Sequence, residues 1–370
     1  MNRLIIVGNG FDKAHRLDSD YNSFIKHFLI KSFNSFKQVS GDTYSDEIIK
    51  ISKKGNSTLV PSTNNIDGEI FTTITELING NYAYDFEYLS KFAEEICTDA
   101  ELKWVDIERA YYKHLIFEFN KIKDKESISD DDYDSINVLN NQMRILGEAL
   151  DEYLQEENKK YKNYSIHSRD VFSSFREKEF EAKVWAEMPW KDEKADKKEP
   201  EKVMIANFNY TNPFQSHRDN IDVVNIHGKL KNVYHPIVFG YGDERDDNYK
   251  ELEKAGSDIL LKYIKSFAYF QNNEYQRLLG FIESGDFEVW IAGHSCGLSD
   301  KTLLAQIFEH ESCKNIRVYH YKKNATDDNY NEIVYNIARI MEDKIKMRSI
   351  VTPKDDENLF DYVVNIVEAW

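Results

Sequence analysis

Cysteine is scarce in this chain. Three of its 370 residues are cysteines, Cys97, Cys296 and Cys313, and they lie far apart in the sequence. An odd number of widely spaced cysteines indicates neither a disulfide framework nor a four-ligand zinc module. The sequence therefore predicts a protein of a reducing compartment, the cytoplasm, with no bound metal.

Long hydrophobic runs are also missing. No segment approaches the roughly 18 consecutive apolar residues that a membrane-spanning helix needs. The N-terminus enters an apolar stretch within a few residues and has neither an extended hydrophobic region nor a small-residue cleavage site. We therefore expect no signal peptide and no association with a membrane.

The chain has fewer basic than acidic residues. Lys and Arg number 48 against 65 Asp and Glu, which gives a formal net charge of −17. An acidic surface repels phosphate backbones, so binding to nucleic acid is disfavoured, although a local basic pocket is compatible with this charge. A metal-dependent nuclease is a weaker hypothesis, because the acidic residues show no metal-ligand spacing and the run at 243–247 suits a solvated loop.

The chain does contain short, continuous apolar runs. Hydrophobic residues make up 41% of it and aromatic residues 14%, which is enough for a substantial core. Continuous rather than alternating apolar runs are typical of strands buried on both faces of a parallel sheet. We predict strands at 4–7, 203–206, 223–226, 237–239, 289–292 and 316–319, and helices near 256–283, 300–311 and 328–345. This alternation predicts an α/β protein with a doubly wound parallel sheet.

A long segment of different character separates the first two of these strands. Residues 32–85 are rich in Ser, Asn, Thr and Gly and predict loops, whereas residues 86–124 and 130–160 carry apolar residues at helical spacing. A further helix is expected near 168–187, and the charged run at 191–200 predicts a solvated loop that closes the insertion. These patterns predict three parts: a first βα unit at 1–31, a mostly helical insertion at 32–200 and the remainder of the core at 201–370.

Polar or glycine-containing turns follow four of the predicted strands. The carboxyl ends of parallel strands meet at one edge of a sheet, where open α/β sheets place their ligand sites, so we expect the four turns to converge. They are Gly8-Asn9-Gly10-Phe11-Asp12, Asn207-Phe208-Asn209-Tyr210-Thr211, His227-Gly228 and Gly293-His294-Ser295-Cys296-Gly297-Leu298-Ser299-Asp300.

Each turn has a functional and a structural interpretation. Glycines after a buried strand let the backbone approach a phosphate, but they also suit a tight turn, and the full GxGxxG fingerprint is missing because position 13 is lysine. His227 suits a general base near neutral pH or a structural histidine. Asn207 and Asn209 are suited to a ligand site at the end of the strand or to capping the helix that follows. Asp300 suits a contact with a ribose hydroxyl or the N-cap of the helix that follows it.

Together these segments resemble the AbiH family of bacterial abortive-infection proteins, which act in defence against phage. The opening residues 2–15 are the most specific match, and Trp104-Val105-Asp106-Ile107-Glu108 looks like the family's Trp-x-x-hydrophobic-Glu helix. Trp104 and Glu108 lie one turn apart on a helix, so they suit a core aromatic beside a paired carboxylate, or a helix that points Glu108 into a nucleotide site.

The AbiH family is in turn similar to sirtuin-like NAD-binding domains of bacterial defence systems. That similarity implies a Rossmann-like, sirtuin-like sheet split by the insertion, with Asn209 and His227 as the catalytic residues that cleave the nicotinamide–ribose bond of NAD. Thr211 stands where Asp is common in that class, and the zinc module of protein deacylases is missing, which disfavours deacylation. The residues implied to bind the substrate are Gly8, Asn9, Gly10, Phe11, Asp12, Gly228, Gly293, His294, Ser295 and Asp300.

Two functions are compatible with these observations. The first is an NAD glycohydrolase that depletes NAD during infection, with NAD as a substrate rather than a redox cofactor. The alternative is a non-catalytic nucleotide-binding sensor or interaction module, whose helical insertion contacts a phage-derived or defence-system protein. Either protein could form a homo-oligomer.

Overall fold

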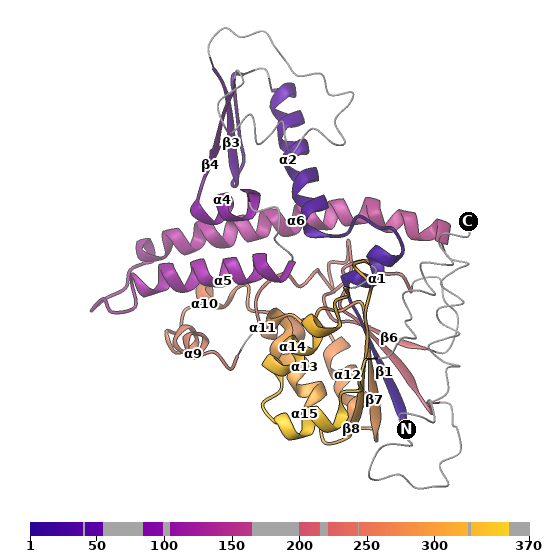
Figure 1. Cartoon of the computed structure of the whole chain (residues 1–370). Coiled ribbons are helices and arrows are strands. Elements are labelled where there is room, and N and C mark those ends of the chain that lie inside the picture. The colour runs from indigo at the N-terminus through magenta and orange to yellow at the C-terminus, as the bar shows by residue number, and fades with distance from the viewer. Residues whose placement is uncertain are drawn as a thin grey trace, which may run out of the picture. The chain divides into compact units, whose positions relative to one another are not determined.

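The computed structural model describes residues 1–39, 41–54, 84–98, 104–164, 200–214, 221–242, 244–324 and 327–354. The chain divides into two compact units, and each has its own sheet (Figure 1). The first unit comprises Met1–Ser19, Leu154–Tyr249 and Ile264–Trp370, and the second comprises Asp20–Tyr153 and Lys250–Tyr263.

A five-stranded parallel sheet forms the centre of the first unit. Its strands are β1 (Asn2–Val7), β5 (Val203–Asn207), β6 (Asp222–Asn225), β7 (Phe287–Ala292) and β8 (Cys313–Tyr319). They lie in the order β6-β5-β1-β7-β8, and every neighbouring pair is parallel. After β1 the chain adds β5 and β6 on one side, then returns to add β7 and β8 on the other. The α/β class predicted from the sequence is confirmed.

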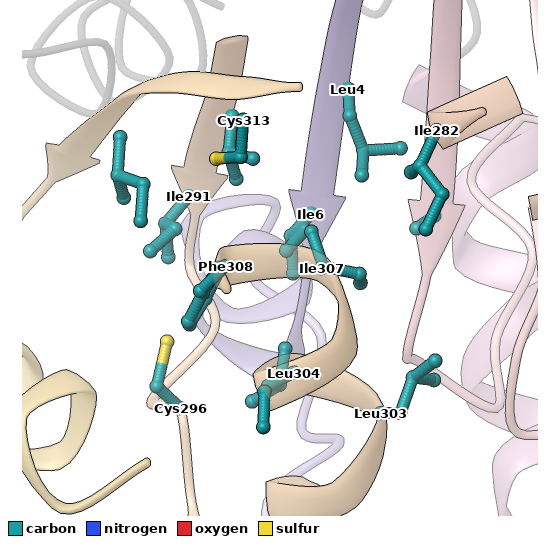
Figure 2. Packing of buried hydrophobic residues seen from close by; sticks show 14 of the residues in the cluster. Leu4, Ile6, Ile282, Ile291, Cys296, Leu303, Leu304, Ile307, Phe308 and Cys313 are labelled. Carbon is teal, nitrogen blue, oxygen red and sulfur yellow. The ribbon is translucent and has the colours of Figure 1, made fainter. Parts of the chain in front are cut away.

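β1 and β7 are buried along their whole length, and most of their side chains are apolar. On one face Ile6 and Ile291 belong to a hydrophobic cluster with Leu304, Ile307 and Phe308, which Figure 2 shows beside them. The helices that contribute to this cluster are α12 (Glu274–Ile282), α13 (Lys301–Phe308), α14 (Tyr330–Ile340) and α15 (Lys344–Ile350).

A smaller cluster covers the opposite face of the sheet. Ile5 and Trp290 pack there with Phe11 of α1 (Asn9–Ala14) and with Phe214. Because successive residues of β1 alternate between the two clusters, its continuous apolar sequence is explained by burial on both faces.

Two sequence predictions in this region were wrong. Residues 237–239 form no strand: Val238 and Phe239 are buried in a loop, where the Val238 amide donates to the His227 carbonyl over 2.9 Å. The single helix expected near 256–283 is broken into α10 (Asp258–Leu261), α11 (Lys265–Ala268), the 3-10 turn η3 (Tyr269–Gln271) and α12. Buried apolar residues occur in loops as well as in strands, and periodicity alone does not separate the two.

The second unit contains an antiparallel sheet and several helices. Its sheet has the order β2-β3-β4, a feature that the prediction of loops over 32–85 missed. Its elements are α2 (Tyr21–Gln38), β2 (Thr43–Ser45), β3 (Ile49–Lys53), β4 (Tyr84–Tyr88), α4 (Lys91–Thr98), α5 (Trp104–Asn120), η2 (Asp130–Tyr133), most of α6 (Asp134–Tyr164), most of α9 (Asp247–Lys254) and α10.

The helix predicted over 130–160 is confirmed by η2 and α6. Its apolar stripe, which includes Ile136, Met143 and Leu150, is buried, and so is Glu108 of α5. The predicted helix near 168–187 and almost all of the charged run at 191–200 lie outside the described residues. Among the described residues, no helix has both the length and the apolar character that a membrane crossing requires.

The helix-covered face of the sheet should carry a large share of the stability. We expect Ile307→Ala, at a fully buried position of α13, to lower the free energy of unfolding by about 2–5 kcal/mol, because it removes apolar contacts and leaves a cavity. The matched variant Ile345→Ala, at a position of α15 that is 76% exposed, should change it by less than about 0.5 kcal/mol. Urea unfolding followed by circular dichroism measures both values, and equal losses would contradict this assignment of the core.

Candidate functional site

The turns after β1, β5, β6 and β7 lie at the carboxyl ends of the parallel strands. β1 and β7 are adjacent and mark the point where the strand order reverses, which is where open α/β sheets place their ligands. All of the predicted site residues belong to the first unit.

The turns after β1 and β7 touch each other through their backbones. The Gly10 amide donates to the Gly293 carbonyl over 2.8 Å. A Cβ atom at Gly8 would lie 2.7 Å from the Cα atom of His294, and one at Gly10 would lie 2.9 Å from the Cα atom of Gly293. At Gly293, which has a φ of +77°, a Cβ atom would lie 2.3 Å from the Phe11 nitrogen. Close packing between the two turns therefore explains these glycines.

The side chains of Asn9 and Phe11 make structural contacts within the first unit. Asn9 Nδ2 donates to the Ser19 carbonyl over 2.9 Å and to the Ser19 hydroxyl over 2.8 Å. The Phe11 ring is fully buried, with ring centroids 4.5 Å from His15 and 5.8 Å from Phe214. These contacts anchor α1 and the loop that follows it.

Asp12 links the turn after β5 to α1. Its buried carboxylate accepts from Asn209 Nδ2 over 2.7 Å and from the Thr211 hydroxyl over 2.6 Å. Asn209 Nδ2 also donates to the Gly8 carbonyl over 3.1 Å, so its amide group joins the turn after β5 to the turn after β1. Among the described residues, Asn209 Oδ1 has no hydrogen-bond partner and can still accept a hydrogen bond from a ligand. Sequence reasoning did not assign a role to Thr211.

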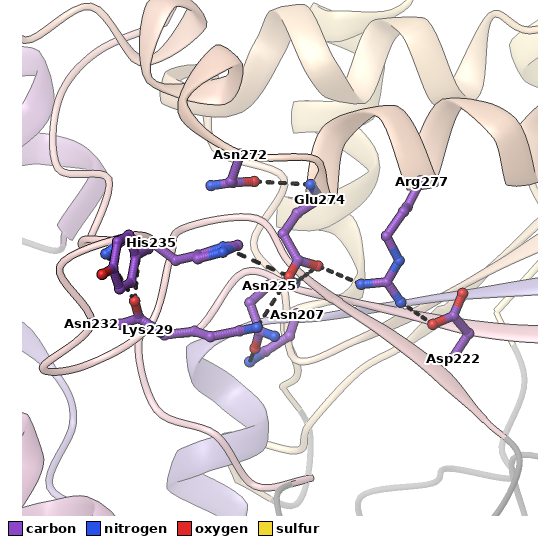
Figure 3. Close-up of polar contacts among 10 residues, drawn as sticks. Asn207, Asp222, Asn225, Lys229, Asn232, His235, Asn272, Glu274 and Arg277 are labelled. Atoms are coloured by element: carbon purple, nitrogen blue, oxygen red, sulfur yellow. Dashed lines mark hydrogen bonds and ion pairs between the residues drawn. The ribbon is translucent and has the colours of Figure 1, made fainter.

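Asn207, the last residue of β5, belongs to a hydrogen-bond network next to the site. Its Nδ2 atom donates to Asn225 Oδ1 over 3.1 Å, and the Asn225 amide donates to Glu274 of α12 over 3.3 Å (Figure 3). The buried Glu274 carboxylate also accepts from Lys229 over 3.1 Å and from Arg277 over 2.9 Å. This network holds the ends of β5 and β6 against α12 and gives Asn207 a structural role.

A second polar cluster forms around Asp300. His227 Nε2 lies 2.9 Å from Asp300 Oδ1, and Lys265 Nζ lies 3.0 Å from the same oxygen and 3.4 Å from His227 Nε2. All three side chains are buried. Lys265 was not predicted, because a single lysine in Tyr263-Ile264-Lys265-Ser266-Phe267 carries no sequence signal that separates it from a surface lysine.

The environment of Asp300 explains its ionisation. It stands at the N-cap position of α13, yet its side chain makes no capping hydrogen bond. Burial by itself would raise the pKa of Asp300, but the charge of Lys265 and the hydrogen bond from His227 outweigh burial and hold this pKa well below its ordinary value. Asp300 is therefore a carboxylate, and it accepts hydrogen bonds from the ammonium group of Lys265 and from the ring of His227.

The same neighbours keep His227 neutral. Burial is the largest effect that lowers the pKa of His227, and Lys265 lowers it further, against the opposing effect of Asp300. Because an ionised carboxylate only accepts hydrogen bonds, the proton of neutral His227 resides on Nε2. Among the described residues, no group bonds its Nδ1 atom. The ring therefore presents an unprotonated nitrogen that can accept a proton.

His294 lies beside this cluster. Its Nδ1 atom accepts from the Cys296 amide over 3.0 Å, and its Nε2 atom lies 3.7 Å from Asp300 Oδ2. The Phe208 ring packs on both His227 and His294, with centroid distances of 5.3 and 4.5 Å. Burial raises the pKa of the Cys296 thiol, which disfavours a thiolate nucleophile at this position.

Two predicted residues take no part in these contacts between turns. Gly228 has a φ of +82°, and a Cβ atom there would lie 2.0 Å from the Pro236 carbonyl oxygen, so the turn after β6 requires glycine. Ser295 is exposed, and its carbonyl accepts from Asn336 over 2.8 Å. Within the described residues, no group of three or more His, Cys, Asp or Glu side chains could hold a metal ion.

A comparison with models of protein families found a match that covers most of the chain. The model of the bacteriophage abortive infection AbiH family matches residues 4–321. The chain belongs to the AbiH family. The matched residues include part or all of every strand of the parallel sheet, and they contain every residue of the Asp12 and Asp300 clusters. No curated protein matches the chain. Membership of the AbiH family supports a role in antiphage abortive infection and confirms the resemblance to that family drawn from the sequence.

The AbiH-family turn after β7 should not tolerate a side chain at Gly293. We expect Gly293→Ala to lower the free energy of unfolding by about 2 kcal/mol or more, because the added methyl group meets the Phe11 nitrogen and the backbone is left-handed. The control Gly280→Ala, in α12 with open space around it, should raise it by up to about 1 kcal/mol. Thermal unfolding of both variants tests this, and a stable Gly293→Ala protein would show that the two turns do not pack in this way.

Proposed function

We propose that this AbiH-family chain is an NAD glycohydrolase that depletes NAD during phage infection. The observation that carries the proposal is the buried His227–Asp300 pair, in which an unprotonated ring nitrogen lies at the carboxyl edge of the sheet. Numbered by their order in the chain, the five strands follow 3-2-1-4-5, an order found in Rossmann-like dinucleotide-binding sheets. This order supports the Rossmann-like, sirtuin-like interpretation of the sequence.

The proposed reaction needs a base and an orienting group. Water attacks C1′ of the nicotinamide ribose, the C1′–N bond breaks, and nicotinamide leaves as a neutral base with the electron pair of that bond. His227 Nδ1 takes the proton released by the water, and Asp300 stabilises the imidazolium that results. Asn209 Oδ1 accepts a hydrogen bond from a ribose hydroxyl or from the attacking water, while its amide nitrogen is held by Asp12 and Gly8.

Removal of either residue should slow NAD loss. In cells that express the chain and are infected by a phage that triggers it, we expect His227→Ala and Asn209→Ala to reduce the rate of NAD loss by about 10²–10⁴-fold. His114→Gln, in the second unit, serves as the matched control and should act as the wild type does. Mass spectrometry of NAD and ADP-ribose measures the rates. Intact NAD in triggered wild-type cells, or variants as fast as the wild type, would refute the proposal.

The non-catalytic sensor remains the second candidate, and binding measurements separate the two. Calorimetry with purified protein and NAD should show binding, followed by slow release of nicotinamide if the chain is an enzyme. Binding that leaves NAD intact under triggering conditions would identify a sensor instead. Protein that binds neither NAD nor ADP-ribose would contradict both functions.

The rate should depend on pH through His227. The ordinary pKa of histidine is 6.5, and burial lowers that of His227. The base is active when neutral, so activity should be lost only as the pH falls below 6.5 and should be flat between that value and neutral pH. A pH–rate profile with its acid limb centred above this value would assign the proton transfer to another group.

A further inference from the structure

Lys265 is a buried lysine with no role in the reaction described above. It is 2% exposed and begins α11, where its amide donates to the Tyr241 carbonyl over 3.0 Å. Moving an ammonium group out of water is costly, and an ion pair compensates for that cost only where its geometry is favourable. A neutral residue would fill this position at lower cost if packing were its only purpose.

The position of the ammonium group is specific. Asp300 Oδ1 lies between two donors, Lys265 Nζ at 3.0 Å and His227 Nε2 at 2.9 Å. The two nitrogens lie 3.4 Å apart, so Lys265 faces the same side of the carboxylate as the histidine. A lysine that only neutralised Asp300 could lie at the other oxygen, near His294. At its actual position it acts on the histidine as well.

We propose that Lys265 is a positioning residue for His227: it keeps Asp300 ionised and opposes protonation of the neighbouring ring, so that the ring stays neutral with its proton on Nε2 and its Nδ1 atom open. This inference rests on the proposed function for its effect on catalysis. Its electrostatic part concerns the protein alone and is measured without NAD.

Few charged or titratable groups face His227. Among the described residues they are Asp300 from the turn before α13, Lys265 from α11, His294 from the turn after β7 and the Tyr210 ring from the turn after β5. Asp300 favours the imidazolium form, whereas Lys265 and His294 oppose it. Removal of Lys265 should therefore raise the pKa of His227, and removal of the Asp300 charge should lower it.

The experiment is an NMR titration of the full chain with isotope-labelled histidine. The His227 signal is assigned as the one that His227→Gln removes. In Lys265→Met we expect His227 to titrate about 1 pH unit or more above its wild-type value, because a like charge in contact has been removed. In Asp300→Asn it should titrate below the wild-type value. Lys265→Arg should keep the wild-type titration. Lys229→Met, which removes a lysine paired with Glu274, is the control and should leave it unchanged.

A companion variant guards against misfolding. Lys265→Met leaves the buried carboxylate of Asp300 without its lysine partner, which can destabilise the fold. Lys265→Met is therefore also built in the Asp300→Asn protein, which has no carboxylate at position 300. Relative to Asp300→Asn alone, the double variant should again titrate at higher pH. If His227 titrates at the same pH with and without Lys265 in both backgrounds, the inference is overturned.

The pH–rate profile provides the link to catalysis. If triggered wild-type protein hydrolyses NAD, the acid limb of Lys265→Met should move to higher pH by the shift seen in the titration. A titration that moves while the acid limb does not would overturn the positioning role in catalysis. Wild-type protein that never hydrolyses NAD would refute the proposed function, and the NMR titration would still decide the electrostatic role of Lys265.

Discussion

The structure of this sheet edge depends on the backbone contact between the turns after β1 and β7. β1 and β7 are neighbours in the sheet, and glycines at 8, 10 and 293 allow their turns to meet without intervening side chains. That contact brings His294 close to Gly8, and the turn after β7 leads on to Asp300. The amides of Gly8, Gly10 and Phe11 are hydrogen-bonded to the Ala292, Gly293 and Gly8 carbonyls. Binding of a diphosphate by the Gly8 and Gly10 amides would require the turn after β1 to separate from the end of β7 and the turn that follows it.

The second constraint is charge buried at the same edge. Asp12 accepts from Asn209 and Thr211, whereas Asp300 accepts from His227 and Lys265. Of the two buried carboxylates, Asp300 is the one that contacts the proposed base, so it is the one that can support proton transfer. Buried ion pairs add little to stability on their own, so the Asp300 cluster is better explained by what it does to His227.

Much of the fold of the first unit was predictable because its signals are local. Continuous apolar runs identified all five strands of the parallel sheet, and the turn residues after four of them identified its carboxyl edge. The prediction failed at 237–239 and across 256–283, where apolar residues are buried by loops and short helices. It also missed β2 and β3, since short strands with polar residues resemble loops in sequence.

The sequence by itself determined the parallel sheet, the AbiH family and the residues that lie at the ends of the strands, because each of these depends on short stretches of chain. Only the tertiary structure decided what those residues contact. It paired Asp12 with Asn209, gave Asp300 contacts other than a capping hydrogen bond to α13, and placed Lys265 beside His227, which lies 38 positions away in the chain. Such pairings are set by how distant segments pack, and no local pattern encodes the distance between two atoms.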